Sequence, residues 1–196
     1  MKKSILSTVA ILLCLSTASY AQNIKKGTIE VGGGLGIGMN SEEFDVDGAS
    51  DDMEVKSTSF SASTLYYIRP NIGIGGTWDY VSREYDLFGN KMEYNDYSIG
   101  PIISYNISMD KQIGFKLQGG AVKYFSETSV DGSKFEFNGF VWLAKGVISY
   151  FITKNISFNG SVAYTFGEIE LETNIGDADT DYSNFTSHVG ISVYLN

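Results

Sequence analysis

Apolar and polar residues alternate most clearly in the stretch from Tyr97 to Gly120. Two alternating runs flank a short polar turn at 108–111. Period-two alternation on both sides of a tight turn predicts a β-hairpin. One face is continuously apolar and ends in aromatic residues, whereas the other carries small or polar residues such as Ser98, Gly100 and Lys116. This pattern is typical of a membrane-spanning strand pair, with lipid outside and a packed polar interior.

The same alternation recurs along the chain and predicts eight strands. The segments are 27–39, 57–68, 72–85, the two runs of the hairpin at 97–120, 135–152, 156–171 and 184–195. Each is long enough to cross a bilayer as a tilted strand, which takes about 9–11 residues. The outward positions are expected to include Val31, Leu35, Phe60, Trp78, Ile103, Trp142, Phe158, Val189 and Leu195.

The connections alternate in length. Those at 69–71, 108–111 and 153–155 are short, whereas those at 40–56, 86–95, 127–134 and 173–183 are longer and more polar. Short turns at one rim and long loops at the other are a feature of outer-membrane barrels. Tyr67, Tyr105 and Tyr150 precede the short turns, and we expect them at the lower membrane interface, where amphipathic rings accumulate.

The N-terminus carries the signature of a secretory signal peptide. Lys2 and Lys3 precede an apolar run from Ile5 to Leu15, and small residues follow, so cleavage is expected after Ala21. The alternative is a lipoprotein signal that uses Cys14, but Leu13 is larger than the small residue such signals place before the cysteine. We therefore predict a signal peptide at 1–21 and a single domain at 22–196.

Composition narrows the classes of function. Cys14 is the only cysteine, so disulfides and thiolate metal sites are excluded from the mature chain. Without Lys2 and Lys3 there are 12 basic residues against 23 acidic ones, a net charge of −11. This charge argues against nucleic acid as a partner. The 22 glycines, 13 tyrosines and 12 phenylalanines suit a small barrel with aromatic girdles.

With these features, the chain resembles the small eight-stranded outer-membrane barrels of Gram-negative bacteria, the OmpA-like and OmpX-like β-barrel domains. The resemblance covers the whole mature chain and implies an all-β, eight-stranded antiparallel up-and-down transmembrane barrel in the cell outer membrane. It also implies lipids, lipopolysaccharide and the barrel-assembly machinery as partners of a monomer. Such barrels usually end in an aromatic residue, whereas this chain ends Tyr194-Leu195-Asn196.

The alternation places six ionisable residues on the inner face. Buried charges need partners, and we expect the acids to face the bases in a lumenal salt-bridge network. An eight-stranded barrel is just wide enough for its own side chains, which favours a structural plug. The alternative is a gate for a small conductance. The residues are Glu30, Asp79, Arg83, Lys116, Lys145 and His188.

Two motifs that suggest ligand chemistry have simpler interpretations. The glycine-rich stretch 32–38 does not have the spacing of a dinucleotide-binding loop and is not followed by a helical pattern. Asp177, Asp179 and Asp181 have the first spacings of a calcium loop, but Tyr182 and His188 occupy the positions that require Gly and Glu. We therefore predict neither a cofactor nor a metal site, and the acidic loops are interpreted as solvated.

Catalysis is not expected. His188 is the only histidine, and Ser187 points to the opposite strand face. Ser192 is on the same face but too far along the strand to form an adjacent nucleophile–base pair. The leading hypothesis is a non-enzymatic surface protein for membrane integrity or adhesion. The alternatives are a narrow channel for ions or small solutes, a lipid-modifying enzyme built on His188, and a soluble lipocalin-like binder.

Overall fold

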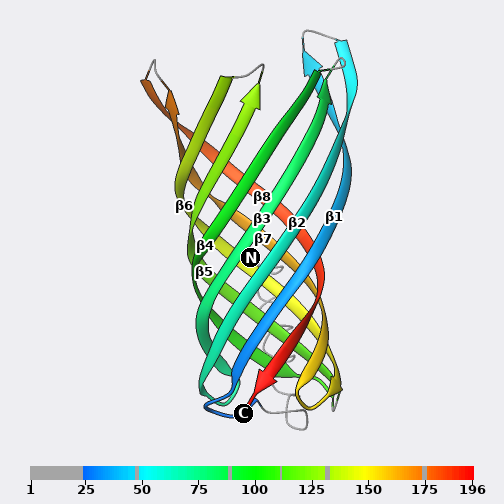
Figure 1. Ribbon diagram of the computed structural model, residues 1–196, viewed down its shortest axis with the longest axis vertical. Helices are drawn as coiled ribbons and strands as arrows, with labels where there is room; N and C mark the ends of the chain where they lie inside the picture. Colours follow the sequence, from blue (N-terminus) through cyan, green and yellow to red (C-terminus); the bar gives the residue numbers. More distant parts are fainter. Residues whose placement is uncertain (1–23, 47–48, 88–89, 111, 131–132, 174–175) are drawn as a thin grey trace, which may run out of the picture.

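The computed structural model is a closed, all-β barrel of eight antiparallel strands in sequence order (Figure 1). It describes residues 24–46, 49–87, 90–110, 112–130, 133–173 and 176–196. The predicted signal peptide therefore lies outside the described residues. Among them, no helix is long and apolar enough to span a membrane. The strands are β1 (Ile29–Val46), β2 (Ala49–Arg69), β3 (Ile72–Leu87), β4 (Asn90–Ser108), β5 (Ile113–Val130), β6 (Ser133–Thr153), β7 (Ile156–Thr173) and β8 (Gly176–Leu195).

The strands are longer than the sequence predicted, and the long polar loops were a wrong prediction. The strands β1 and β2 continue into 40–46 and 49–56, where Asn40 pairs with Val55 and Val46 with Ala49. The β3–β4 and β7–β8 hairpins extend in the same way, to Leu87–Asn90 and Thr173–Gly176. These extensions are rich in polar residues, and the paired backbone satisfies their N–H and C=O groups.

The barrel closes between the first and last strands. Ile29 pairs with Leu195, and the ladder continues to Leu35 and Val189. This register places Tyr194 inside the barrel, with 2% of its surface exposed, and Leu195 outside, with 53% exposed. The last strand therefore closes the barrel although the final residue is not aromatic. Above Leu35 and Val189 the two strands pair only with β2 and β7.

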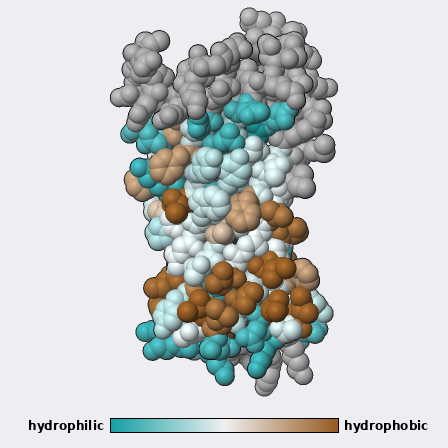
Figure 2. Space-filling model, viewed as in Figure 1, coloured by the Kyte–Doolittle hydropathy of each residue, from teal (hydrophilic) through white to brown (hydrophobic). Residues whose placement is uncertain are grey.

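The outer face is apolar, as the alternation predicted. Val31, Trp78, Ile103, Trp142 and Phe158 are all exposed. Figure 2 shows brown apolar patches around the lower and middle barrel, with hydrophilic residues at the lower rim. Strands of 16 to 21 residues are about twice as long as a bilayer crossing needs, so their upper parts extend beyond the apolar band.

Candidate functional site

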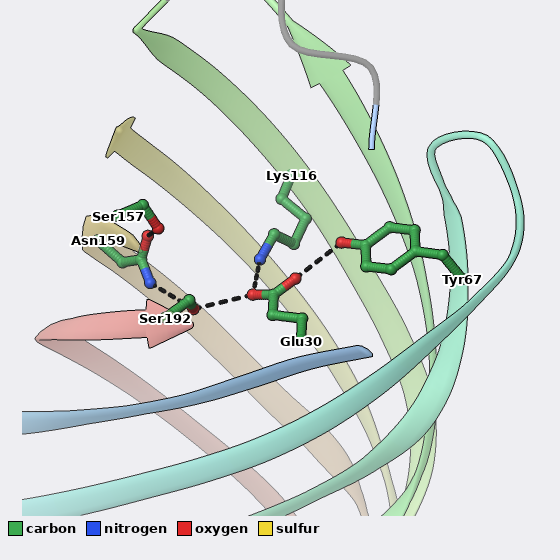
Figure 3. A network of polar contacts seen from close by, with 6 residues as sticks. All are labelled: Glu30, Tyr67, Lys116, Ser157, Asn159 and Ser192. Atoms are coloured by element: carbon green, nitrogen blue, oxygen red, sulfur yellow. Dashed lines mark hydrogen bonds and ion pairs between the residues drawn. The ribbon is translucent and has the colours of Figure 1, made fainter. Parts of the chain in front are cut away.

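The inner face holds three polar layers stacked along the barrel axis, and together they form the candidate site. The lowest layer centres on Glu30 of β1, which is 3% exposed. Lys116 of β5 forms an ion pair with Glu30 Oε1, and the Ser192 hydroxyl of β8 donates to the same oxygen at 2.9 Å. The Tyr67 hydroxyl of β2 donates to Glu30 Oε2 at 2.7 Å. Four strands thus converge on one carboxylate (Figure 3).

The lowest layer continues to β7. The Asn159 side chain hydrogen-bonds Ser192 Oγ at 2.7 Å, and Ser157 lies 2.9 Å from the same amide. Both carboxylate oxygens of Glu30 therefore have donors, and the donor Ser192 is itself held by a neighbour (Figure 3). A buried charge requires such complete pairing, because an unpaired carboxylate in a low-dielectric interior is costly.

An apolar cap lies beneath this layer. The rings of Phe151 and Tyr194 pack with centroids 5.3 Å apart, and Lys116 Nζ lies 5.8 Å from the Tyr194 ring. Ile24, before β1, is 5% exposed and belongs to the same apolar cluster. Its backbone N–H and C=O both pair with Asn71 at 3.1 Å, which fastens the N-terminal segment to the β2–β3 turn. The lower lumen is therefore filled by a buried ion pair and by apolar side chains, and a cavity of about 200 Å³ lies among Ile24, Phe151, Tyr194 and residues of the rim.

The middle layer contains Asp79, Lys145 and His188. Lys145 Nζ of β6 lies 4.0 Å from Asp79 Oδ1 of β3, a loose ion pair, and Thr77 donates to Asp79 Oδ2 at 3.0 Å. His188 of β8 is 5% exposed, and neither ring nitrogen has a hydrogen-bond partner within the described part of the chain. It lines two small cavities of about 20 and 30 Å³, one above it and one below. Each is large enough for a water molecule.

The top layer centres on a residue that the sequence analysis did not select. Asp96 of β4 is 4% exposed and pairs with Arg83 Nη1 of β3 at 2.7 Å. The Tyr124 hydroxyl of β5 donates to Asp96 Oδ1 at 2.7 Å, and the Tyr124 ring packs against Tyr182 of β8 at 4.3 Å. Asp96 was missed because the predicted strand began at Tyr97. Its place in the alternation with Ser98 and Gly100 was the available signal.

All six predicted residues lie on the inner face, but they do not form one network. Glu30 pairs with Lys116, Asp79 faces Lys145 loosely, and Arg83 pairs with Asp96 instead of a predicted acid. His188 joins no pair. One tyrosine prediction was wrong, because Tyr67 is fully buried in the lumen while its neighbour Tyr66 is 47% exposed on the outer face. Tyr105 and Tyr150 are exposed outside, as expected.

The arrangement does not resemble a hydrolase site. A nucleophilic serine needs a base within hydrogen-bond reach, but the Ser192 hydroxyl donates to Glu30 and His188 has no partner. Within the described side chains there is also no group of three or more His, Cys, Asp or Glu residues able to hold a metal ion. What the site does chemically is neutralise buried charge and fill the lumen.

Comparison with solved structures identifies the fold. The outer membrane protein OprG from Pseudomonas aeruginosa aligns with a TM-score of 0.65 at 13% identity, over 90% of this chain and 99% of that one. Neisserial surface protein A aligns at 0.55 and 13% identity, over 86% and 97%. AlkL, solved in lipid bilayers, aligns at 0.54 and 14% identity, over 91% and 93%. No family model matches the chain, and no curated protein does.

Proposed function

This chain has the fold of the small eight-stranded outer-membrane barrels, and we propose that it is a sealed, non-enzymatic barrel of a bacterial outer membrane. Its role is to maintain membrane integrity or to present a surface to the outside. The observation that supports the proposal is the filled lower lumen, where the Glu30–Lys116 pair lies beside the apolar cluster of Ile24, Phe151 and Tyr194. Its partners are outer-membrane lipids, lipopolysaccharide and, during insertion, the barrel-assembly machinery, and it works as a monomer.

The acidic upper end limits what an adhesive surface can bind. The strand extensions carry most of the 23 acidic residues, and within the described side chains Glu93, Glu168, Glu170 and Asp181 are exposed there. The Yersinia pestis attachment protein Ail has been solved with the polyanionic heparin analogue sucrose octasulfate, at a TM-score of 0.54 to this chain. A polyanion would be repelled by the acidic end of this barrel. A surface partner of this chain would therefore be neutral or cationic.

Electrical recording tests the seal. The purified barrel, reconstituted in a planar bilayer, is expected to show no discrete conductance. Glu30→Ala removes the carboxylate that Lys116, Tyr67 and Ser192 share. Asp79→Ala is the matched control, because it removes an inner carboxylate that does not belong to the Glu30 layer. Stable single-channel steps from the unmodified protein would refute the sealed-barrel proposal.

A narrow channel is the second candidate, and the cavities beside His188 favour it. Each has room for water, and they lie on either side of His188: one is lined by Glu30 and Lys116, and the other extends toward Asp96. If the Glu30–Lys116 pair is a gate, Glu30→Ala opens a cation or anion current that Asp79→Ala does not. If the pair is purely structural, Glu30→Ala lowers stability and leaves the bilayer silent.

A further inference from the structure

Basic residues outnumber acidic residues at the rim of the short turns. Lys25, Lys26, Arg69 and Lys154 are exposed there, and Asp110 is the acidic residue among the described residues of the same rim. The opposite end of the barrel carries most of the acidic residues, together with Lys56, Lys91 and Lys134. The net charge is therefore basic at the rim of the short turns and acidic at the other end.

The chain path gathers three of these cations on one side of the rim. The N–H of Gly27 donates to the carbonyl of Tyr67 at 2.8 Å, which holds the segment with Lys25 and Lys26 against the end of β2. Arg69 is the last residue of that strand. The side chains of Lys25, Lys26 and Arg69, here called the basic rim, are thus exposed around one turn.

The basic rim lies next to the apolar band of the outer face. Ile68, next to Arg69, is 38% exposed on the outer face, and Tyr66 is 47% exposed two residues further up the strand. One residue of a strand spans about 3.3 Å, so the cations lie within a few ångströms of where the hydrocarbon ends. Lipid phosphates occupy that level, and long basic side chains extend toward it from the edge of an apolar surface. Figure 2 shows the hydrophilic rim directly below the apolar belt.

We propose that the basic rim binds the headgroups of anionic glycerophospholipids in the leaflet that the short turns face. The charge complementarity is direct, since the rim contributes three exposed cations to a site beside lipid phosphates that carry a net negative charge. Anionic lipids attract membrane-proximal Lys and Arg, and salt screens the attraction. The lipid anchors the barrel at a fixed depth, opposite the acidic end. This inference does not depend on whether the lumen conducts.

A tryptophan beside the rim reports which lipid lies there. Trp78 and Trp142 are replaced by Phe and Ile68 by Trp, so that the single indole faces lipid next to Arg69. The protein is reconstituted in phosphatidylcholine with phosphatidylglycerol, and one lipid at a time carries brominated acyl chains, which quench the indole on contact. Brominated phosphatidylglycerol is expected to quench at least about twofold more than brominated phosphatidylcholine at equal content, and the excess should vanish in high salt.

Three variants locate the effect. K25Q/K26Q/R69Q should equalise the two quenchers, whereas K25R/K26R should preserve the preference. K56Q/K91Q/K134Q removes the same number of charges from residues of the opposite end and should also preserve it. Heat-shifted migration on a gel checks that each variant is a folded barrel. Equal quenching in the unsubstituted rim, or a preference that survives K25Q/K26Q/R69Q, would overturn the proposal.

Discussion

Lys116 of β5 and Glu30 of β1 form an ion pair across the barrel floor, with side-chain exposures of only 2% and 3%. Removing one partner leaves the other charge buried and unpaired, which typically costs 3–5 kcal/mol. Glu30→Ala is therefore expected to lower the free energy of unfolding by about 3–5 kcal/mol. Urea unfolding in lipid vesicles, followed by the fluorescence of Trp78 and Trp142, measures this loss.

The double variant E30L/K116M tests whether the loss comes from an unpaired charge. It removes both charges while retaining bulk in the lumen. Replacing a buried pair with apolar side chains is often neutral or stabilising, so the double variant should be more stable than either single variant. Additive losses would show that the two residues stabilise the barrel independently of each other, and would contradict the explanation by an unpaired charge.

Tyr67 and Tyr66 are neighbours with opposite surroundings, and this difference gives a matched experiment. Tyr67 donates a hydrogen bond to a buried carboxylate, whereas Tyr66 faces outward. Tyr67→Phe should cost about 1.5–3 kcal/mol, the usual range for a hydrogen bond to a charged group. Tyr66→Phe removes the same hydroxyl from the outer face of the strand, away from the Glu30 network. It should change the urea unfolding midpoint little. Equal effects of the two substitutions would contradict the inward placement of Tyr67.

His188 is expected to tolerate replacement. Its two ring nitrogens are buried without protein partners, so the imidazole gains no hydrogen bonds from the chain to offset its desolvation. His188→Leu should leave the stability unchanged or raise it by up to about 1 kcal/mol. Ser192→Ala is the contrasting variant, because it removes a donor to Glu30 and should destabilise. A large loss of stability in His188→Leu would indicate that ordered water satisfies the imidazole.

Asp96 is buried and is expected to stabilise the upper barrel, whereas Glu93 on the same strand is exposed. Asp96→Asn retains the shape but weakens the contacts with Arg83 and with the Tyr124 hydroxyl. We expect a loss of about 1.5–3 kcal/mol, again the range for hydrogen bonds to a charged group. Amide hydrogen exchange along β3, β4 and β5 would reveal the loosening, with Glu93→Gln as the control. Unchanged protection in Asp96→Asn would contradict a stabilising role for this layer.

The face of most strand residues was predictable, Tyr67 excepted, because alternation is a local property of a strand. Successive side chains point to opposite sides, so the outward position of Trp142 and the inward position of Lys116 followed from the sequence. The strand ends were less predictable. The segments beyond the apolar alternation are rich in polar residues and were interpreted as loops, although the strands continue through them. Asp96 was missed because it lies one residue before the predicted start of its strand at Tyr97.

What the sequence determined was therefore an all-β chain with an apolar outer face and an inner face that carries charges. Only the tertiary structure decided which charges meet. Lys116 and Glu30 are 86 residues apart in the chain, and Ser192 and Glu30 are 162 apart. Their meeting depends on the register of every intervening strand pair and on closure between β1 and β8, since a shift of one residue would turn a side chain to the other face. Strand tilt and closure are properties of the whole sheet, and they gave Arg83 the partner Asp96 and left His188 without one.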